Sequence, residues 1–156
     1  MRIDPRCKRV NELSDQYHQL FRQVAERYLS EECAKAGVES LCLGDYSFLF
    51  TIGEEPSGMI SMADAAKKLG INPSTATRQV NRLFMSGLVT KSPSRGDERR
   101  YDVRLTEKGA ALLERMDERL YEAVQKTYVD VSEEEMQTVY GYLEKCIGQL
   151  NRLVQG

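Results

Sequence analysis

Residues 62–78, MADAAKKLGINPSTATR, decide the fold. They predict two short helices joined by a tight turn at Gly70-Ile71-Asn72, because glycine and asparagine mark chain reversals between helical segments. The first helix is expected over Met62–Leu69. Ser61 can cap it, and Asp64 occupies the capping-box position three residues later.

The second helix of the pair is expected over Pro73–Ser86. Asn72 is a good N-cap, and Pro73 sits at the first helical position, where its missing N–H removes no hydrogen bond. Gly87 ends the helix. A helix-turn-helix unit therefore lies in the middle of the chain.

A β-hairpin follows this unit. Leu88–Lys91 and Tyr101–Leu105 alternate apolar and polar residues, which indicates two strands. We expect a long basic hairpin tip over Ser92–Arg100, since it contains Pro93 and Gly96. Together with a short strand at Met59-Ile60, the order helix, turn, helix and hairpin is that of a winged helix-turn-helix.

Long helices flank this centre. Apolar spacing predicts helices over residues 10–36, 44–52 and 107–128, and a last helix that follows Ser132, with a Ser132/Glu135 capping box. The fold class is mainly α with a small β-wing. We divide the chain into an N-terminal dimerisation helix (1–40), a winged helix-turn-helix DNA-binding domain (41–106) and C-terminal dimerisation helices (107–156).

The first and last helices both carry apolar stripes that lie outside the compact winged core. A chain of 156 residues offers these stripes too little partner surface on its own. Wrapping them around a second copy would bury them, so the sequence predicts a homodimer.

Charge is unevenly distributed. The chain carries a net charge of −2, yet residues 71–108 hold eight basic and four acidic residues, so this segment is at +4 and the remainder at −6. Phosphate binding depends on the local field, because salt screens charges beyond ~8–10 Å. A basic segment on an acidic body favours double-stranded DNA as the partner.

The second helix of the pair is the expected recognition helix. Ala76, Val80 and Leu83 share one face and can seat it on the core, and no acidic residue occurs between Ile71 and Asp97. Groups that reach bases and phosphates lie elsewhere on the helix and on the wing. The expected DNA-binding residues are Ser74, Thr75, Thr77, Arg78, Asn81, Arg82, Lys91, Arg95, Asp97, Arg99 and Arg100.

Two alternatives to this interpretation remain open. Winged helices can also dock proteins, so a protein-interaction module without DNA binding fits the same fold. The other alternative is a thiol-based redox regulator, with Cys7, Cys33 or Cys42 as the sensing thiol. We expect Cys7 in an N-terminal segment ahead of the first helix. We expect Cys146 in the apolar stripe of the last helix.

Other functional classes find no support in the sequence. We find no nucleophile-elbow, P-loop or paired-carboxylate pattern, and no zinc-ligand spacing, so we expect no catalytic residues, no metal and no cofactor. No apolar run is long enough to span a bilayer and no signal peptide is evident. The expected location is the cytoplasm.

These features together resemble the MarR family of bacterial regulators. The resemblance rests on residues 62–78, on Val80-Asn81-Arg82-Leu83, on Asp97-Glu98-Arg99-Arg100 and on Val103-Arg104-Leu105-Thr106-Glu107-Lys108-Gly109. It implies a two-fold dimer, joined by its terminal helices, that binds a pseudo-palindromic operator and represses transcription. It also implies that Asp97 orients Arg99 in the minor groove.

The resemblance extends to an effector and has one departure. Many family members release DNA on binding a small aromatic or lipophilic molecule, and others on cysteine oxidation. Candidate residues for binding such a molecule are Tyr17, His18, Arg22 and Tyr46. The family's second helix often starts with L-T-x-x-Q, whereas this chain has Leu41-Cys42-Leu43-Gly44-Asp45. Because cysteine is a poor helix cap, we expect a different turn there.

Overall fold

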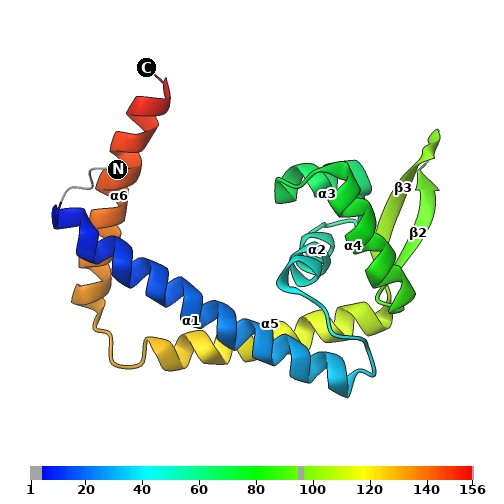
Figure 1. Cartoon of the computed structure of the whole chain (residues 1–156), viewed down its shortest axis with the longest axis horizontal. Coiled ribbons are helices and arrows are strands. Elements are labelled where there is room, and N and C mark those ends of the chain that lie inside the picture. The colour runs from blue at the N-terminus through cyan, green and yellow to red at the C-terminus, as the bar shows by residue number, and fades with distance from the viewer. Residues whose placement is uncertain (1–4, 95–96, 156) are drawn as a thin grey trace. The chain divides into compact units, whose positions relative to one another are not determined.

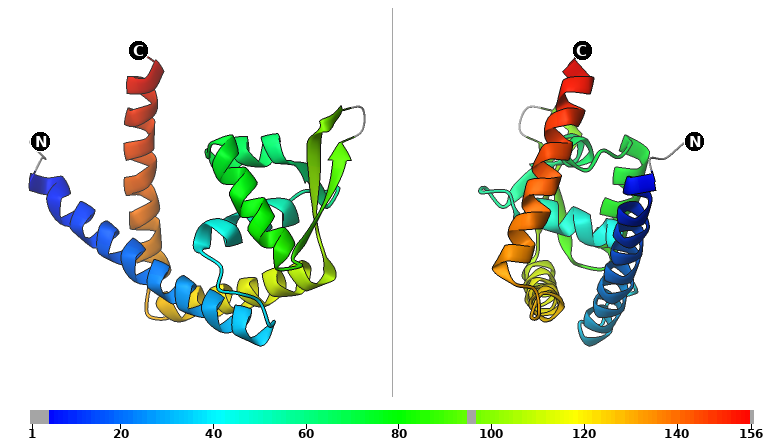
Figure 2. Two further views of the ribbon diagram at one scale, coloured as in Figure 1. Left: turned by 45° about the vertical axis from the view of Figure 1, so that its right-hand side comes forward. Right: turned by 90° about the vertical axis from the view of Figure 1, so that its left-hand side faces the viewer.

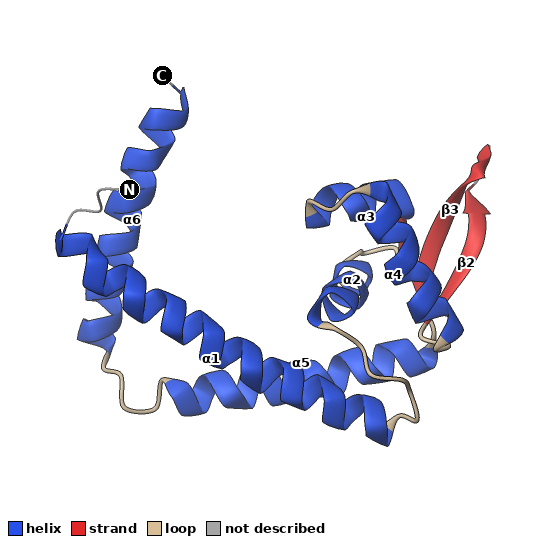
Figure 3. Cartoon of the chain, viewed as in Figure 1, coloured by secondary structure: helices blue, strands red, loops and turns tan. Residues whose placement is uncertain are grey.

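The computed structural model describes the backbone of residues 5–94 and 97–155 and the side chains of residues 7–94 and 101–154. In chain order the elements are α1 (Pro5–Lys35), α2 (Leu43–Gly53), β1 (Met59–Ser61), α3 (Met62–Leu69), α4 (Pro73–Met85), β2 (Val89–Ser94), β3 (Asp97–Leu105), α5 (Glu107–Thr127) and α6 (Glu133–Gln155) (Figures 1 and 3). They form two compact units, residues 1–120 and 121–156. The chain is thus mainly α-helical with one small sheet, as predicted.

The helix-turn-helix forms through the caps expected from its sequence. Ser61 Oγ accepts the backbone N–H of Asp64 at 3.1 Å, and Asn72 Oδ1 accepts that of Thr75 at 2.8 Å. Gly70 adopts φ +63°, a left-handed conformation that costs glycine little, and so reverses the chain between α3 and α4. These local interactions set the path of the chain into α4.

The three strands form an antiparallel sheet in the order β1-β3-β2. Val103 of β3 pairs with Ile60 on one side and with Lys91 on the other. The β2–β3 hairpin extends away from the helices beside it, as the left-hand view in Figure 2 shows. This hairpin is the wing.

The strands of the wing are longer than predicted. The expected tip, Ser92–Arg100, was wrong: β2 continues to Ser94 and β3 begins at Asp97. Pro93 lies within β2, where a proline is tolerated because β2 is an edge strand of the described sheet, with β3 as its neighbour. A register shift at Pro93/Ser94 accommodates it.

The first helix also differs from the prediction. It begins at Pro5 and not at Val10, so Cys7 belongs to α1 and not to a segment ahead of it. Proline suits the first turn of a helix, and the basic residues that follow are good helix formers. Apolar spacing indicates which residues of a helix are buried, and the described side chains at the start of α1, residues 7–10, are exposed.

The core of the first unit lies between α1, α2, α4, the sheet and α5. Its largest fully buried side chains are Leu29, Phe48, Leu49, Ile52, Val80, Leu83, Leu88, Val89, Val103, Leu112 and Met116. The helix-turn-helix and the wing are therefore built on one hydrophobic core, which fixes the recognition helix relative to the hairpin.

The start of α5 is locked onto the end of α4. Thr106 donates its hydroxyl hydrogen to the carbonyl of Gly87 at 2.7 Å, and its Oγ1 accepts the N–H of Gly109 at 3.0 Å. Gly109 lies against the backbone of Leu88, and a Cβ added at Gly109 would stand 2.0 Å from the carbonyl oxygen of Leu88. The pattern Leu-Thr-x-x-Gly at residues 105–109 thus joins the wing to the helix that follows.

A buried carboxylate joins α1 to α5. Glu32 is 1% exposed and accepts hydrogen bonds from Lys35 at 2.7 Å, Arg115 at 3.0 Å and Arg119 at 3.1 Å. The hydrogen bond from Lys35 is the first cause that lowers the pKa of Glu32 below its ordinary value, against a smaller opposing effect of burial. Arg119 also stacks over the Tyr28 ring at 3.8 Å.

We predict that Glu32→Gln lowers the free energy of unfolding by about 2 kcal/mol at neutral pH. The reason is that Lys35, Arg115 and Arg119 lose the negative charge with which they pair. A carboxyl whose pKa is lowered in the folded state stabilises the fold above its ordinary pKa. This contribution is lost as the pH falls through the folded-state pKa of Glu32, which lies below the ordinary 4.5.

Urea titrations at several pH values check this prediction for Glu32→Gln. The difference from wild type should shrink in acid, whereas the exposed Glu26→Gln should change little. A difference that stays constant down to the acid limit would contradict the assignment.

The second unit consists of the last turns of α5 and the whole of α6. Ser132 and Glu135 form the predicted capping box: the Ser132 N–H donates to Glu135 Oε2 at 2.8 Å, and Ser132 Oγ accepts the Glu135 N–H at 3.3 Å. The apolar stripe of α6 is exposed within the single chain, at Val139, Leu143, Ile147, Leu150, Leu153 and Val154.

Candidate nucleic-acid interface

The recognition helix α4 is seated as predicted. Ala76, Val80 and Leu83 are buried, with exposed fractions of 1% or less. Its opposite face carries exposed polar side chains at Ser74, Thr77, Arg78 and Asn81, with Thr75 half-buried. Because the buried apolar residues lie on the other side of α4, this polar face is available to an external partner.

Two hydroxyl groups on α4 already donate hydrogen bonds within the chain. Ser74 Oγ donates to Asn72 Oδ1 at 2.8 Å, and Thr77 Oγ1 donates to the carbonyl of Pro73 at 2.9 Å. The lone pairs of both oxygens remain available as acceptors, which match the amino groups that adenine and cytosine present in the major groove. Arg78 adds a cationic donor, with no carboxylate at ion-pair distance among the described side chains.

Arg82 lies differently from its neighbours. Its Nη1 donates to Asp45 Oδ2 at 2.7 Å, and Asp45 on α2 is fully buried while the Arg82 side chain is 48% exposed. The hydrogen bond from Arg82 to Asp45, followed by their charge attraction, raises the pKa of the guanidinium. Arg82 therefore ties α4 to α2 and neutralises a buried charge, in addition to any contact that it makes outside the chain.

Sequence reasoning missed Asp45. It noted this residue only as a departure from the family's usual helix start, and expected an altered turn. In the structure α2 begins regularly at Leu43, because Asp45 Oδ2 accepts the backbone N–H of Cys42 at 3.1 Å. The capping bond runs from the third helical residue back to the cap. The signal in the sequence was that Asp45 is the one charged residue of the mainly apolar helix α2.

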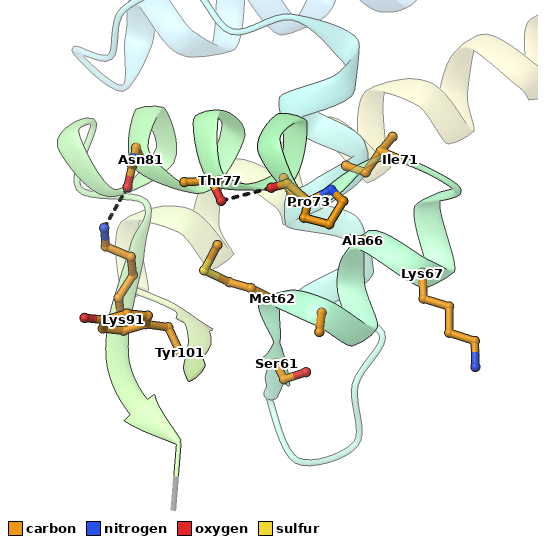
Figure 4. A pocket seen from close by; sticks show the side chains of 12 residues that line it. Ser61, Met62, Ala66, Lys67, Ile71, Pro73, Thr77, Asn81, Lys91 and Tyr101 are labelled. Atoms are coloured by element: carbon orange, nitrogen blue, oxygen red, sulfur yellow. Dashed lines mark hydrogen bonds between the residues drawn. The ribbon is translucent and has the colours of Figure 1, made fainter. Parts of the chain in front are cut away.

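A lysine of the wing reaches the recognition helix. Lys91 Nζ on β2 donates to Asn81 Oδ1 at 2.8 Å (Figure 4). The same Nζ stands 4.6 Å from the centroid of the Phe84 ring. Both α4 residues lie on the side of the helix that faces β2. Sequence reasoning placed Lys91 and Asn81 in the same site but gave no sign that they touch.

An open cleft of about 710 Å³ lies between α3, α4 and the wing (Figure 4). Its apolar lining includes Met62, Ile71 and the Tyr101 ring, and its polar lining includes Thr77, Asn81 and Lys91. The cleft adjoins the polar face of α4, so the recognition helix stands clear of the wing along part of its length.

The tip of the wing carries the remaining predicted DNA-binding residues. Arg95 lies outside the described residues. Asp97, Arg99 and Arg100 have a described backbone, within β3, but their side chains lie outside the described part. Their position at the end of the hairpin follows from the strand bounds, and the pairing of Asp97 with Arg99 stays a prediction.

The candidate effector residues lie on two helices, α1 and α2. Tyr17 and His18 are in edge-to-face contact at 5.7 Å between ring centroids on α1, and Arg22 is exposed on the same helix. Tyr46 on α2 donates its hydroxyl hydrogen to Asp117 Oδ1 at 2.8 Å, and burial is the first cause that raises the pKa of its phenol. The effector site stays a prediction.

The cysteines differ in exposure. Cys33 is buried, and burial raises the pKa of its thiol, which disfavours the thiolate that a redox sensor needs. Cys7 and Cys42 are exposed, and Cys146 is half-buried. Within the described residues, no group of three or more histidine, cysteine or acidic side chains is placed to hold a metal ion, and no helix is long and apolar enough to cross a membrane.

The fold and the site define a winged helix-turn-helix protein: a seated recognition helix, a three-stranded sheet and a projecting hairpin. Residues 41–101 match the MarR family. The region matched covers the helix-turn-helix and most of the wing, and the resemblance seen in the sequence is confirmed.

Comparison with known proteins agrees with this assignment. The HTH-type transcriptional regulator PecS of Dickeya dadantii (strain 3937) is 34% identical over 89 residues, which are 55% of this chain and 54% of PecS. The chain therefore spans about half the length of the curated relative that it matches.

Solved structures share the fold along nearly the whole chain. A mutant MarR from E. coli in complex with operator DNA has a TM-score of 0.69 at 21% identity, covering 94% of this chain and 99% of that one. A MarR protein from Peptoclostridium difficile has a TM-score of 0.72 at 22% identity, with coverages of 97% and 94%. At these identities the likeness concerns the fold alone.

Proposed function

We propose that the protein is a sequence-specific, double-stranded DNA-binding transcriptional regulator that acts as a homodimer on a pseudo-palindromic operator. One observation carries this proposal: α4 is seated by buried apolar residues and turns an acid-free polar face outward beside a basic wing. An α-helix of this kind fits the major groove of B-DNA. The solved structure of a mutant MarR from E. coli, which shares this fold, is a complex with operator DNA, and this supports the proposal.

Basic residues supply the sequence-independent part of the affinity. The proposed phosphate-binding residues are Arg78, Arg82, Lys91, Arg95, Arg99 and Arg100. Each neutralised phosphate adds about −0.9 to the slope of log affinity against log salt concentration. A steep fall in affinity with salt is therefore expected, and a protein-docking module would show none.

The homodimer is supported by exposed apolar surface on α1 and on α6. Val10, Leu13 and Leu20 of α1 are 40–53% exposed, and Leu143, Ile147 and Leu150 of α6 are 47–59% exposed. A second copy of the chain would bury both stripes. We further propose a repressor that responds to a small aromatic or lipophilic effector, for which Tyr17, His18, Arg22 and Tyr46 remain the candidate residues.

Selection of bound sequences from a random pool of DNA duplexes tests the proposal. We expect a two-fold symmetric consensus, with half-sites one helical turn apart. A pool that gains no sequence preference over repeated rounds, together with passage through a heparin column without retention, would contradict the proposal and favour the protein-interaction module.

The wing makes a separate prediction. Arg99→Ala is expected to weaken binding to the selected duplex at least tenfold, about 1.4 kcal/mol, because the family resemblance places this guanidinium in the minor groove. A gel-shift titration measures it. The matched control is Arg27→Ala, which removes an exposed arginine from α1 and should leave affinity within about twofold. An Arg99→Ala variant that binds like wild type would remove the wing arginine from the mechanism.

A further inference from the structure

The contact between the wing and the recognition helix has a consequence for sequence preference. Lys91 Nζ lies 2.8 Å from Asn81 Oδ1, and its distance of 4.6 Å to the Phe84 centroid places the ammonium over the ring. Two different interactions, a hydrogen bond and a cation–π contact, hold one lysine against α4. The backbone supports it, since Lys91 pairs with Val103 in the middle of the sheet.

The hydrogen bond fixes which way the Asn81 amide points. An ammonium group has three donors and no acceptor, so only the carbonyl oxygen of the amide can face it. The amide NH₂ is then turned away from Lys91. Asn81 is exposed on the face of α4 that we propose to enter the major groove, so this NH₂ is offered to a base edge.

An asparagine without such a neighbour pairs best with adenine. It accepts a hydrogen bond from adenine N6 through Oδ1 and donates one to N7 through Nδ2. In this structure Oδ1 already accepts from Lys91, and the positive charge beside it disfavours the approach of another donor. What the pair presents is a set of N–H donors. Guanine presents two acceptors in the major groove, O6 and N7, which match these donors.

We propose that Lys91 is a specificity-determining residue: it holds Asn81 in a donor-only state, so that the Lys91–Asn81 pair reads guanine and rejects adenine at one position in each half-site. This inference rests on the proposed DNA-binding function. It assigns to Lys91 the positioning of a base-reading side chain, which differs from the phosphate contact expected from the sequence.

The test compares sequence selection by wild type and by Lys91→Met, which keeps the length of the side chain and removes the ammonium. Wild type should prefer guanine about tenfold over adenine at the position read by Asn81. Lys91→Met frees Oδ1, so adenine should become preferred there while the rest of the consensus is unchanged. Asn81→Ala should remove the preference at this position in either background, which identifies the base pair concerned.

A matched control separates this effect from the loss of a positive charge. Lys108→Met removes an exposed lysine that lies near the end of α4, where its Nζ faces the carbonyl of Ser86 at 3.4 Å. It should lower affinity equally for all sequences. The same uniform loss in Lys91→Met, with guanine still preferred, would overturn the inference and leave Lys91 as a phosphate contact. If wild type itself selects no sequence, the proposed function fails and the inference fails with it. Thermal unfolding of each variant confirms that the fold is kept.

Discussion

Replacing Ile147 and Leu150 of α6 together by glutamate is expected to yield a monomer that binds the selected duplex at least 100-fold more weakly than wild type. The two side chains lie three residues apart on the apolar stripe and are 54% and 59% exposed in the single chain. In a dimer interface the new carboxylates would be buried without partners, which opposes association. A monomer engages only one half-site, and loss of the second linked contact costs roughly 10²–10⁴ in affinity.

Sedimentation velocity gives the mass, and fluorescence anisotropy with the selected duplex gives the affinity. The matched control is the double variant Thr138→Glu, Gln149→Glu, which adds the same charge to exposed positions of α6 on the side away from the stripe. It should remain dimeric and bind normally. A stripe variant that sediments as a monomer and still binds as tightly as wild type would refute the dependence of DNA binding on dimerisation.

The second large effect concerns stability. Gly109→Ala is expected to lower the free energy of unfolding by about 3 kcal/mol, because the added Cβ would lie 2.0 Å from the Leu88 carbonyl oxygen. The obstacle is backbone, which has no alternative rotamer. Relief requires that α5 move away from the end of α4, which also weakens the hydrogen bonds of Thr106 to Gly87 and Gly109.

Urea unfolding at neutral pH measures this loss. Gly141→Ala on α6 is the matched control, since nothing lies within 4 Å of the Cβ that it would add. Within a helix this exchange should be neutral or stabilising by up to about 1 kcal/mol. A Gly109→Ala variant within about 0.5 kcal/mol of wild type would show that the contact between α5 and Leu88 is not tight.

The parts of the fold that the sequence predicts well are those with local causes. Caps at Ser61, Asn72 and Ser132 act within three residues of their partners, and each lies where its sequence pattern indicates. The seating of α4 also followed from spacing alone. A helical period places Ala76, Val80 and Leu83 on one face, and all three are buried.

The parts of the fold that the sequence predicts poorly are those that depend on tertiary contacts. Proline and glycine suggested a long loop in the wing, but pairing with β3 extends β2 through Pro93. Asp45 and Arg82 are 37 positions apart, and no local pattern in either segment indicates the other. Arg82 was therefore assigned to DNA alone, although the structure shows it bound to a buried carboxylate. Lys91 and Asn81 meet for the same reason, through the packing of a strand beside a helix.

The spacing of the half-sites tests the central claim most directly. If two chains present their α4 helices ~34–36 Å apart on one face of the duplex, inserting five base pairs at the centre of the selected operator turns one half-site to the opposite side. We predict that affinity then falls at least 100-fold, to the level of a single half-site, as measured by anisotropy with the full-length protein. Equal affinity for the original and the lengthened duplex would contradict the claim that one rigid dimer reads both half-sites.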